Sequence, residues 1–307
     1  MMVSVRPIED RRLTAIGLLV IAYLFFTIID SCAKWLVQYG GLPTTEIVFV
    51  RYAGQLLIVS AIFLPTRGME LVRTRNLKLE VLRGLFLMGS TIANFTALIF
   101  LPLTVTSSIS FTMPLMLCAL SIPLLGETVG WRRWMAILVG FVGVLIIVQP
   151  GTSSFHPAAF LSLLGAAFTA LYFLFTRKLA GVDPTTTQQF YSALVATICL
   201  IPLVVWGGWV WPASIVGWFC FGTMGAAALV AHQLITVAHR FAPATVLAPF
   251  GYVQIFFMTA SSWLVFNQPP SVWVYVGAPI VIASGLYIWM RERQLSKSII
   301  TEVVARD

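Results

Sequence analysis

Apolar and polar positions alternate along this chain in long blocks rather than with a short period. A membrane span needs about 20 mostly apolar residues to cross a hydrocarbon core roughly 30 Å thick. Ten stretches meet this description with almost no charge inside them. The pattern therefore predicts ten spanning helices, at Leu13–Gln38, Thr44–Leu64, Leu79–Leu101, Leu103–Leu125, Trp134–Gln149, Pro157–Leu179, Gln188–Trp206, Ala213–His239, Pro243–Phe266 and Val272–Met290.

The basic residues fall in every second gap between these stretches. Of the 19 Lys and Arg residues, 17 are predicted to lie at one face of the membrane. The intervening gaps, such as those around Gly40, Pro102 and Gly208, carry none. By the positive-inside rule the basic face and both chain termini are cytoplasmic. The 17 residues are Arg6, Arg11, Arg12, Arg67, Arg73, Arg75, Lys78, Arg83, Arg132, Arg133, Arg177, Lys178, Arg240, Arg291, Arg293, Lys297 and Arg306.

Composition agrees with a chain that lies in lipid. Hydrophobic residues make up 59% and charged residues only 10%, whereas soluble domains carry about 25% charged residues. Ten spans use most of the 307 residues and leave no room for a soluble catalytic domain. The net charge of +8 follows from the loop pattern, so no nucleic-acid partner is expected. The four cysteines are scattered without metal-binding or disulfide spacing, and no metal or cofactor is predicted.

The chain also contains an internal repeat. At a constant offset of 141 positions, Pro43-Thr44-Thr45 matches Pro184-Thr185-Thr186, and Gly84 matches Gly225. The same offset places Phe111 opposite Tyr252. Residues 1–150 and 151–307 thus form two units of five spans each. Because five is odd, the second unit enters the membrane from the opposite side. The predicted fold is an all-α integral membrane protein of two inverted five-helix repeats, an architecture typical of alternating-access transporters.

Several of these features resemble the EamA type of the drug/metabolite transporter superfamily. The resemblance covers nearly the whole chain and rests on the five-plus-five pattern, on Pro43 to Arg51, and on the fourth span from Pro102 to Glu127. It implies a carrier of the cytoplasmic membrane for small metabolites, such as amino acids, riboflavin, S-adenosylmethionine or quaternary amines. The second half departs from the pattern, because Gln268 replaces the loop glutamate and Ser192 stands at the position of Arg51.

Ionisable groups inside a bilayer are costly, so each is a functional candidate. Asp30 and Lys34 are four residues apart and share one helix face. By the helical rise, Asp30 lies roughly 12 Å and Arg51 about 10 Å from the external ends of their helices, so the three side chains are expected to meet there. One interpretation is structural, with Asp30 neutralising Lys34 and Arg51. The other is functional: the cluster binds a carboxylate or phosphate-like group, or Asp30 takes up a coupling proton.

Further polar and aromatic candidates lie at middle depth. The imidazole of His232 is suited to proton coupling, although a lone histidine also serves as an ordinary hydrogen-bonding group. The serines near Pro114 make the fourth span breakable, and small-residue packing is the alternative role for them. The remaining predicted substrate-binding residues are Asn94, Ser107, Phe111, Tyr172, Gln233, Tyr252 and Gln254.

These observations predict a secondary transporter that moves a small amphipathic or aromatic metabolite across the bacterial inner membrane by alternating access. Riboflavin-like vitamins, amino acids and S-adenosylmethionine-like solutes are the candidate substrates. A non-transporting membrane scaffold or regulatory protein is the main alternative. An intramembrane enzyme is a weaker one, because the chain offers neither a paired nucleophile and base nor a metal-binding cluster. The expected partners are the metabolite and the lipid bilayer, and a homodimer is left open.

Overall fold

The computed structural model describes residues 12–125, 130–152, 155–179, 182–242 and 247–304, and within them it is helical with no strand. Long apolar segments bounded by proline, glycine and polar residues fold into helices because a helix satisfies its own backbone hydrogen bonds in lipid. The elements are α1 (Arg12–Gln38), α2 (Thr44–Arg67), η1 (Gly68–Leu71), α3 (Leu77–Phe100), α4 (Leu103–Ser110), α5 (Met113–Leu125), α6 (Trp131–Val148), α7 (Ala159–Leu179), α8 (Thr185–Gly207), α9 (Ile215–Phe241), η2 (Ala248–Val253), α11 (Gln254–Leu264) and α12 (Val272–Val304).

Within the described residues, eight segments are long and apolar enough to cross a membrane. They correspond to the predicted spans one to four, six to eight and ten. The predicted fifth span is represented by a shorter apolar helix, Trp134–Val148. The predicted ninth span begins in residues 243–246, outside the described part of the chain, and continues as η2 and α11. The count of ten therefore stays a prediction. Glu127, the last residue of the fourth-span motif, also falls outside the described residues.

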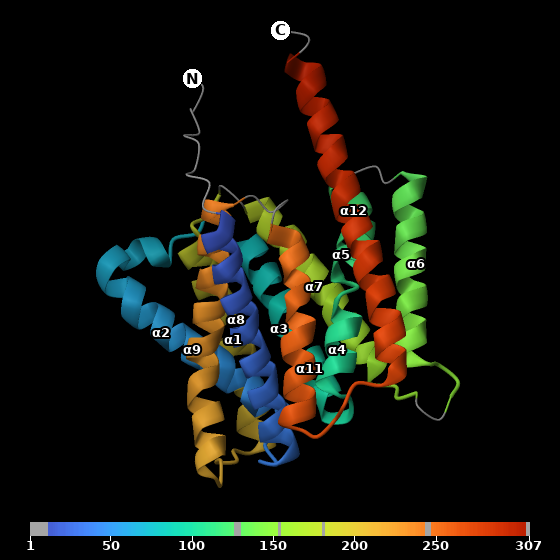
Figure 1. Ribbon diagram of the computed structural model, residues 1–307. Helices are drawn as coiled ribbons and strands as arrows, with labels where there is room; N and C mark the ends of the chain where they lie inside the picture. The colour runs from blue at the N-terminus through green and yellow to red at the C-terminus, as the bar shows by residue number, and fades with distance from the viewer. Residues whose placement is uncertain (1–11, 126–129, 153–154, 180–181, 243–246, 305–307) are drawn as a thin grey trace.

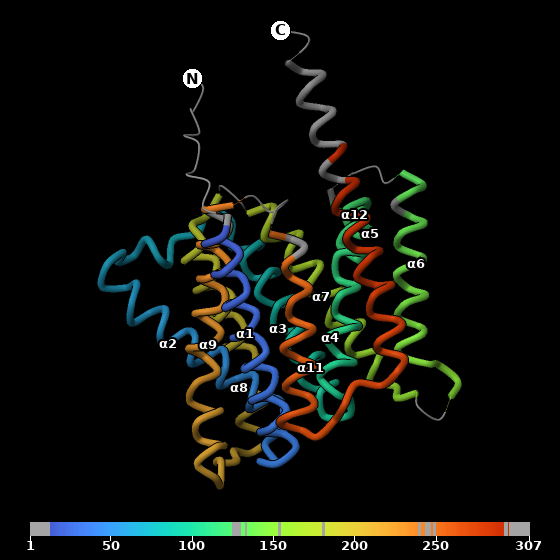
Figure 2. The backbone as a smooth tube through the Cα atoms, viewed as in Figure 1, coloured from blue at the N-terminus to red at the C-terminus, as the bar shows by residue number. Residues whose placement is uncertain are grey.

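Consecutive spans run in alternating directions, as the backbone tube in Figure 2 shows for α1 and α2. The helix α1 begins at the end of the bundle where α12 leaves it (Figure 1). We name this the inner end, because the positive-inside rule predicts that it faces the cytoplasm. The opposite end, where α1 passes into α2, is the outer end.

The predicted fourth span, Leu103–Leu125, is present but interrupted, at the place where the sequence predicts it to be breakable. It divides into α4 and α5 at Phe111 and Thr112, just before Pro114. A proline removes a backbone donor and clashes with the carbonyl four residues earlier, so a break at this point is expected. The predicted ninth span changes in a similar way from the 3₁₀ turn η2 to α11 at Gln254. Both interruptions fall at matching positions of the 141-residue offset.

Helix contacts follow the same offset. The helix α1 packs on α9, and α3 packs on α7, while α2 packs on α8 and α6 on α12. A Cβ added to Gly84 would meet Val195 at 3.0 Å, and one added to Gly225 would meet the backbone of Gly54 at 2.8 Å. Gly54 and Val195 are themselves 141 positions apart. Small residues at helix crossings let backbones approach closely in membranes, and here they do so at equivalent places in both halves.

Candidate functional site

Arg51 is a buried charge between helices of the two halves. It lies two turns into α2, and its side chain is only 5% exposed. Its Nη1 donates to Thr91 Oγ1 of α3 at 3.1 Å, and its guanidinium lies 4.5 Å from the centre of the Tyr52 ring. Its Nε is buried and has no hydrogen-bond partner among the described residues. A buried donor without a partner is costly, so this atom is an unsatisfied donor in the observed conformation.

Asp30 is linked to the Arg51 region through α3, because the two residues hydrogen-bond neighbouring side chains of that helix. Asn94 Nδ2 donates to Asp30 Oδ1 at 3.1 Å, and Asn94 is three residues from Thr91. Residues three apart on a helix have Cβ atoms about 5–6 Å apart. Within the described part of the chain, the structure gives no ion pair between Asp30 and Arg51. We call Asp30, Arg51, Thr91 and Asn94 the outer site.

Lys34 does not join this site, contrary to the expectation that all three charges meet. Its Nζ donates to the backbone carbonyl of Leu101 at 2.6 Å and lies 5.5 Å from the Phe266 ring centre. The carbonyl is available because Pro102, which follows it, ends α3 and starts α4. A free carbonyl buried in the bundle needs a donor, and the Lys34 ammonium supplies it.

His232 and Gln233 lie on α9, which packs against α1 and α2. The His232 ring meets Phe26 of α1 edge-on at 5.2 Å, and its buried Nε2 has no hydrogen-bond partner among the described residues. Gln233 Nε2 donates to Gln189 Oε1 at 3.2 Å. Gln55, one turn beyond Arg51 on α2, also carries a buried Oε1 without a partner in the described part of the protein. Several polar atoms in this region are thus buried but not hydrogen-bonded.

The remaining predicted residues occupy two places. Phe111 and Tyr252 contact each other with ring centres 5.1 Å apart, so the two repeat-related breaks meet. Gln254 begins α11 directly after this contact. Ser107 uses its hydroxyl within its own helix, donating to the carbonyl of Thr104 at 3.1 Å. This local bond uses the donor of the Ser107 hydroxyl and leaves its oxygen able to accept, so the binding role of Ser107 stays a prediction.

Arg83 is a residue that sequence reasoning missed, because it was counted among the basic residues of the inner face. It lies in the second turn of α3 and is 3% exposed. Its Nη2 donates to Tyr172 Oη at 2.8 Å, so the predicted binding residue Tyr172 is engaged by it. Glu80, fully buried, has Oε2 at 3.8 Å from Nη1. The available signal was that Arg83 falls inside the predicted third span, with an acidic residue three positions earlier.

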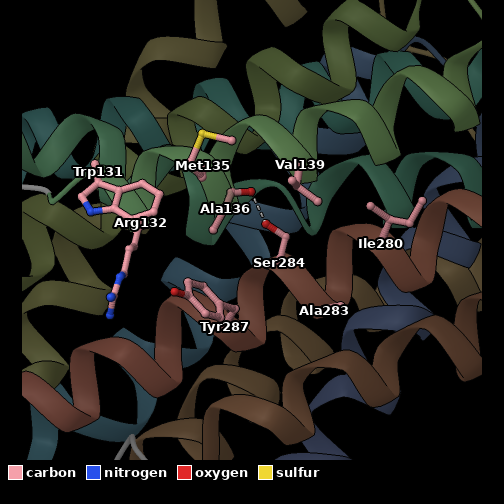
Figure 3. Close-up of a pocket in the computed structure, with 9 residues that line it drawn as sticks. All are labelled: Trp131, Arg132, Met135, Ala136, Val139, Ile280, Ala283, Ser284 and Tyr287. Carbon is pink, nitrogen blue, oxygen red and sulfur yellow. Dashed lines mark hydrogen bonds between the residues drawn. The ribbon is translucent and has the colours of Figure 1, made fainter.

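A groove of about 510 Å³ lies elsewhere, between α6 and α12 (Figure 3). These helices occupy the edge of the bundle opposite α2 (Figure 1), so the groove is separate from the outer site. Its walls are mainly apolar, as expected for a surface that faces lipid chains. Ser284 donates to the carbonyl of Ala136 across it. The lining residues are Trp131, Arg132, Met135, Ala136, Val139, Ile280, Ala283, Ser284 and Tyr287.

A bundle of long apolar helices with charged and amide side chains buried between its halves is typical of multi-pass membrane transport proteins. The model of the EamA-like transporter family matches residues 13–149 and again residues 156–290. The chain belongs to this family. Within the described residues, no group of three or more His, Cys, Asp and Glu side chains is placed to hold a metal ion.

The chain is similar over most of its length to transporters that are named for different substrates. It is 26% identical to an S-adenosylmethionine uptake transporter of Rickettsia prowazekii, over 90% of this chain and 94% of that protein. It is 29% identical to a riboflavin transporter of Vibrio cholerae, with 90% and 93% covered. It is also 29% identical to a pseudopaline exporter of Pseudomonas aeruginosa, with 90% and 95% covered. These relatives differ in cargo and in direction, so similarity supports transport without naming a substrate.

A solved crystal structure shares the fold. It superposes with a TM-score of 0.60 at 15% sequence identity, covering 94% of this chain and 99% of that one. At this identity the likeness concerns the fold alone.

Proposed function

We propose that the protein is a secondary transporter of the bacterial inner membrane for a small amphipathic metabolite that carries an α-amino carboxylate group. The solute binds between the two five-helix repeats at residues 1–150 and 151–307, which have opposite orientation, and alternating access exposes it to each compartment in turn. Two matches of one family model in a single chain support the repeat. The equivalent glycine contacts of Gly84 and Gly225 support it independently.

The substrate class is inferred from the charges of the outer site. Arg51 offers a buried Nε without a hydrogen-bond partner to an anion. Asp30 offers a carboxylate to a cation, and the α3 residues that hold the two side chains, Thr91 and Asn94, are one helical turn apart. Charge-assisted hydrogen bonds are roughly twice as strong as neutral ones. An α-amino acid group presents a carboxylate and an ammonium at short spacing and can satisfy both residues together. A ligand without these charges would leave the buried Arg51 and the half-buried Asp30 poorly paired.

The other polar residues complete the binding region. Thr91 and Asn94 orient Arg51 and Asp30, while His232, Gln233 and Gln55 offer polar atoms to the rest of the solute. The aromatic rings of Phe26 and Tyr52 provide the apolar contacts that a metabolite side chain requires. Asp30 and His232 are the two candidates for uptake of a coupling proton, and a proton gradient is then the driving force.

The test is uptake into proteoliposomes that contain the purified protein. The panel is radiolabelled S-adenosylmethionine, methionine, phenylalanine and riboflavin. We expect saturable uptake of at least one of the three solutes with an α-amino carboxylate, and its loss when Arg51→Gln is reconstituted at equal density. Uptake of riboflavin alone would overturn the substrate class. If none of the four solutes enters the lumen although the protein is inserted, the transport proposal fails in favour of a scaffold.

A further inference from the structure

Arg83 is bonded far more completely than Arg51. Its Nε donates to Thr176 Oγ1 at 2.8 Å. Its Nη1 donates to the Gln188 carbonyl and to Ser192 Oγ, both at 2.7 Å, and its Nη2 donates to Tyr172. These acceptors belong to α7 and α8, so one side chain ties α3 to two helices of the second half. Arg51, in contrast, makes one such bond.

The position of Arg83 relates it to Arg51 through the repeat. Its hydrogen-bond partner Ser192 is the residue that corresponds to Arg51 at the 141-residue offset. Ser192 lies seven residues from the inner start of α8, as Arg51 lies seven residues from the outer start of α2. The guanidinium of Arg83 therefore occupies in the inner half the depth that the guanidinium of Arg51 occupies in the outer half. The repeat counterpart of Arg83 itself is the apolar Met224.

The charge of Arg83 is balanced only in part. All four hydrogen bonds go to uncharged acceptors, namely two hydroxyls of Thr176 and Ser192, a phenol and a backbone carbonyl. The nearby Glu80 carboxylate accepts no hydrogen bond from the described residues and stands at 3.8 Å. A guanidinium binds a carboxylate more strongly than neutral acceptors, often through two parallel bonds. An incoming carboxylate can therefore displace these partners once water and solute reach the inner half.

We infer that Arg83 is a second carboxylate-binding residue of the transport path, placed in the inner half as the counterpart of Arg51. In the observed conformation its four hydrogen bonds hold α3, α7 and α8 together and close the inner half. When the inner half opens, the same donors bind the carboxylate of the solute on the cytoplasmic side. This inference rests on the proposed function, because it assumes a solute with a carboxylate.

The experiment measures transport separately from each face. Right-side-out and inside-out membrane vesicles are prepared with wild-type protein and with Arg83→Gln, and the KM is measured for whichever of S-adenosylmethionine, methionine and phenylalanine is carried. We expect Arg83→Gln to raise the KM at the inner face roughly tenfold to a hundredfold, the effect of losing a charged hydrogen-bonding partner. The KM at the outer face should change by a smaller factor, because it reports only the shift between the closed and open states and not the loss of a contact with the solute. Arg67→Gln is the matched control, since Arg67 is an exposed arginine at the same end that bonds Thr186 of α8.

A second variant separates binding from closure. Tyr172→Phe removes one acceptor of Arg83 but keeps its charge and the ring 4.6 Å from the guanidinium. It should weaken the closed state and lower the KM at the inner face, because a larger fraction of the protein is open to bind. Tyr172→Phe also carries the test if Arg83→Gln does not fold.

Two results would overturn the inference. One is an unchanged inner-face KM in Arg83→Gln with only a lower maximal rate, the behaviour of a purely structural residue. The other is an inner-face KM that rises in Tyr172→Phe. Failure of the proposed function looks different, because wild-type vesicles would then carry none of the three carboxylate solutes from either face.

Discussion

The helices around Arg51 and Arg83 are joined by several side-chain hydrogen bonds in addition to glycine contacts, whereas α6 and α12, at the other edge of the bundle, are joined mainly by glycine contacts, with one hydrogen bond from Ser284 to the carbonyl of Ala136. A Cβ added to Gly277 would lie 2.5 Å from the carbonyl oxygen of Gly143. Close backbone packing of this kind leaves few hydrogen-bond partners between the helices that could be exchanged. The polar region can rearrange by exchanging one acceptor for another. We therefore expect the α6–α12 pair to act as a scaffold and the polar region to move.

The largest effect should come from breaking the scaffold. Gly277→Leu places a branched side chain against Gly143 and Ile147, and overpacking of this size should lower the free energy of unfolding by about 3 kcal/mol or more. Thermal unfolding in detergent measures it. Gly222→Leu on α9 is the control, because a Cβ there meets nothing within 4 Å. Equal melting temperatures for the two variants would contradict the distinction.

Arg51→Gln should do the opposite of Gly277→Leu, lowering solute affinity but not stability. We expect solute affinity to fall roughly tenfold to a hundredfold, equivalent to the 1.5–3 kcal/mol of a hydrogen bond to a charged group. The melting temperature without solute should remain close to that of the wild type, because Arg51 donates a single hydrogen bond to the protein. Equilibrium binding of radiolabelled solute and thermal unfolding are measured on the same sample. A variant that unfolds early yet binds normally would assign Arg51 to the scaffold.

Asp30→Asn tests the coupling role within the polar region. The amide keeps the shape and still accepts the hydrogen bond from Asn94, but it cannot take up a proton at neutral pH. We expect uptake to fall about tenfold, in line with a lost charged partner, and to stop responding to an imposed proton gradient. His232→Gln should keep that response. If the two variants behave in the reverse way, the coupling proton belongs to His232.

The smallest effect concerns the contact between the two breaks. Phe111→Leu should remove an edge-on aromatic contact with Tyr252 that is worth about 0.5–1.5 kcal/mol. A double-mutant cycle with Tyr252→Leu isolates this energy from the change in packing. A coupling energy near zero would mean that the two breaks are independent of each other.

The helices themselves were largely predictable from the sequence, because apolar length and proline positions act locally. The predicted span Leu79–Leu101 and the observed α3, Leu77–Phe100, differ by only two residues at the start and one at the end. The break near Pro114 was expected for the same reason. Trp131–Val148 was harder to classify, since its apolar core is short for a span.

The site was predictable only in part, because its partners are distant in sequence. Asn94 and Asp30 are 64 positions apart, and their contact depends on how α1 packs against α3. Lys34 donates instead to the carbonyl of Leu101, which is free because Pro102 ends the helix. The periodicity of the helix that contains Lys34 does not predict this contact. Arg83 looked like a loop charge because it lies near the end of its span. Its acceptors come from the other half of the chain, more than 85 positions away.

The interruption between α4 and α5 has a mechanical consequence. A continuous helix behaves as one stiff rod, so tilting its outer end also displaces its inner end. A span divided at Phe111 and Thr112 behaves as two short rods joined by a pivot, and the change from η2 to α11 supplies a second pivot facing the first. In the proposed alternating-access cycle, either mouth of the passage can then widen while the opposite mouth keeps its contacts.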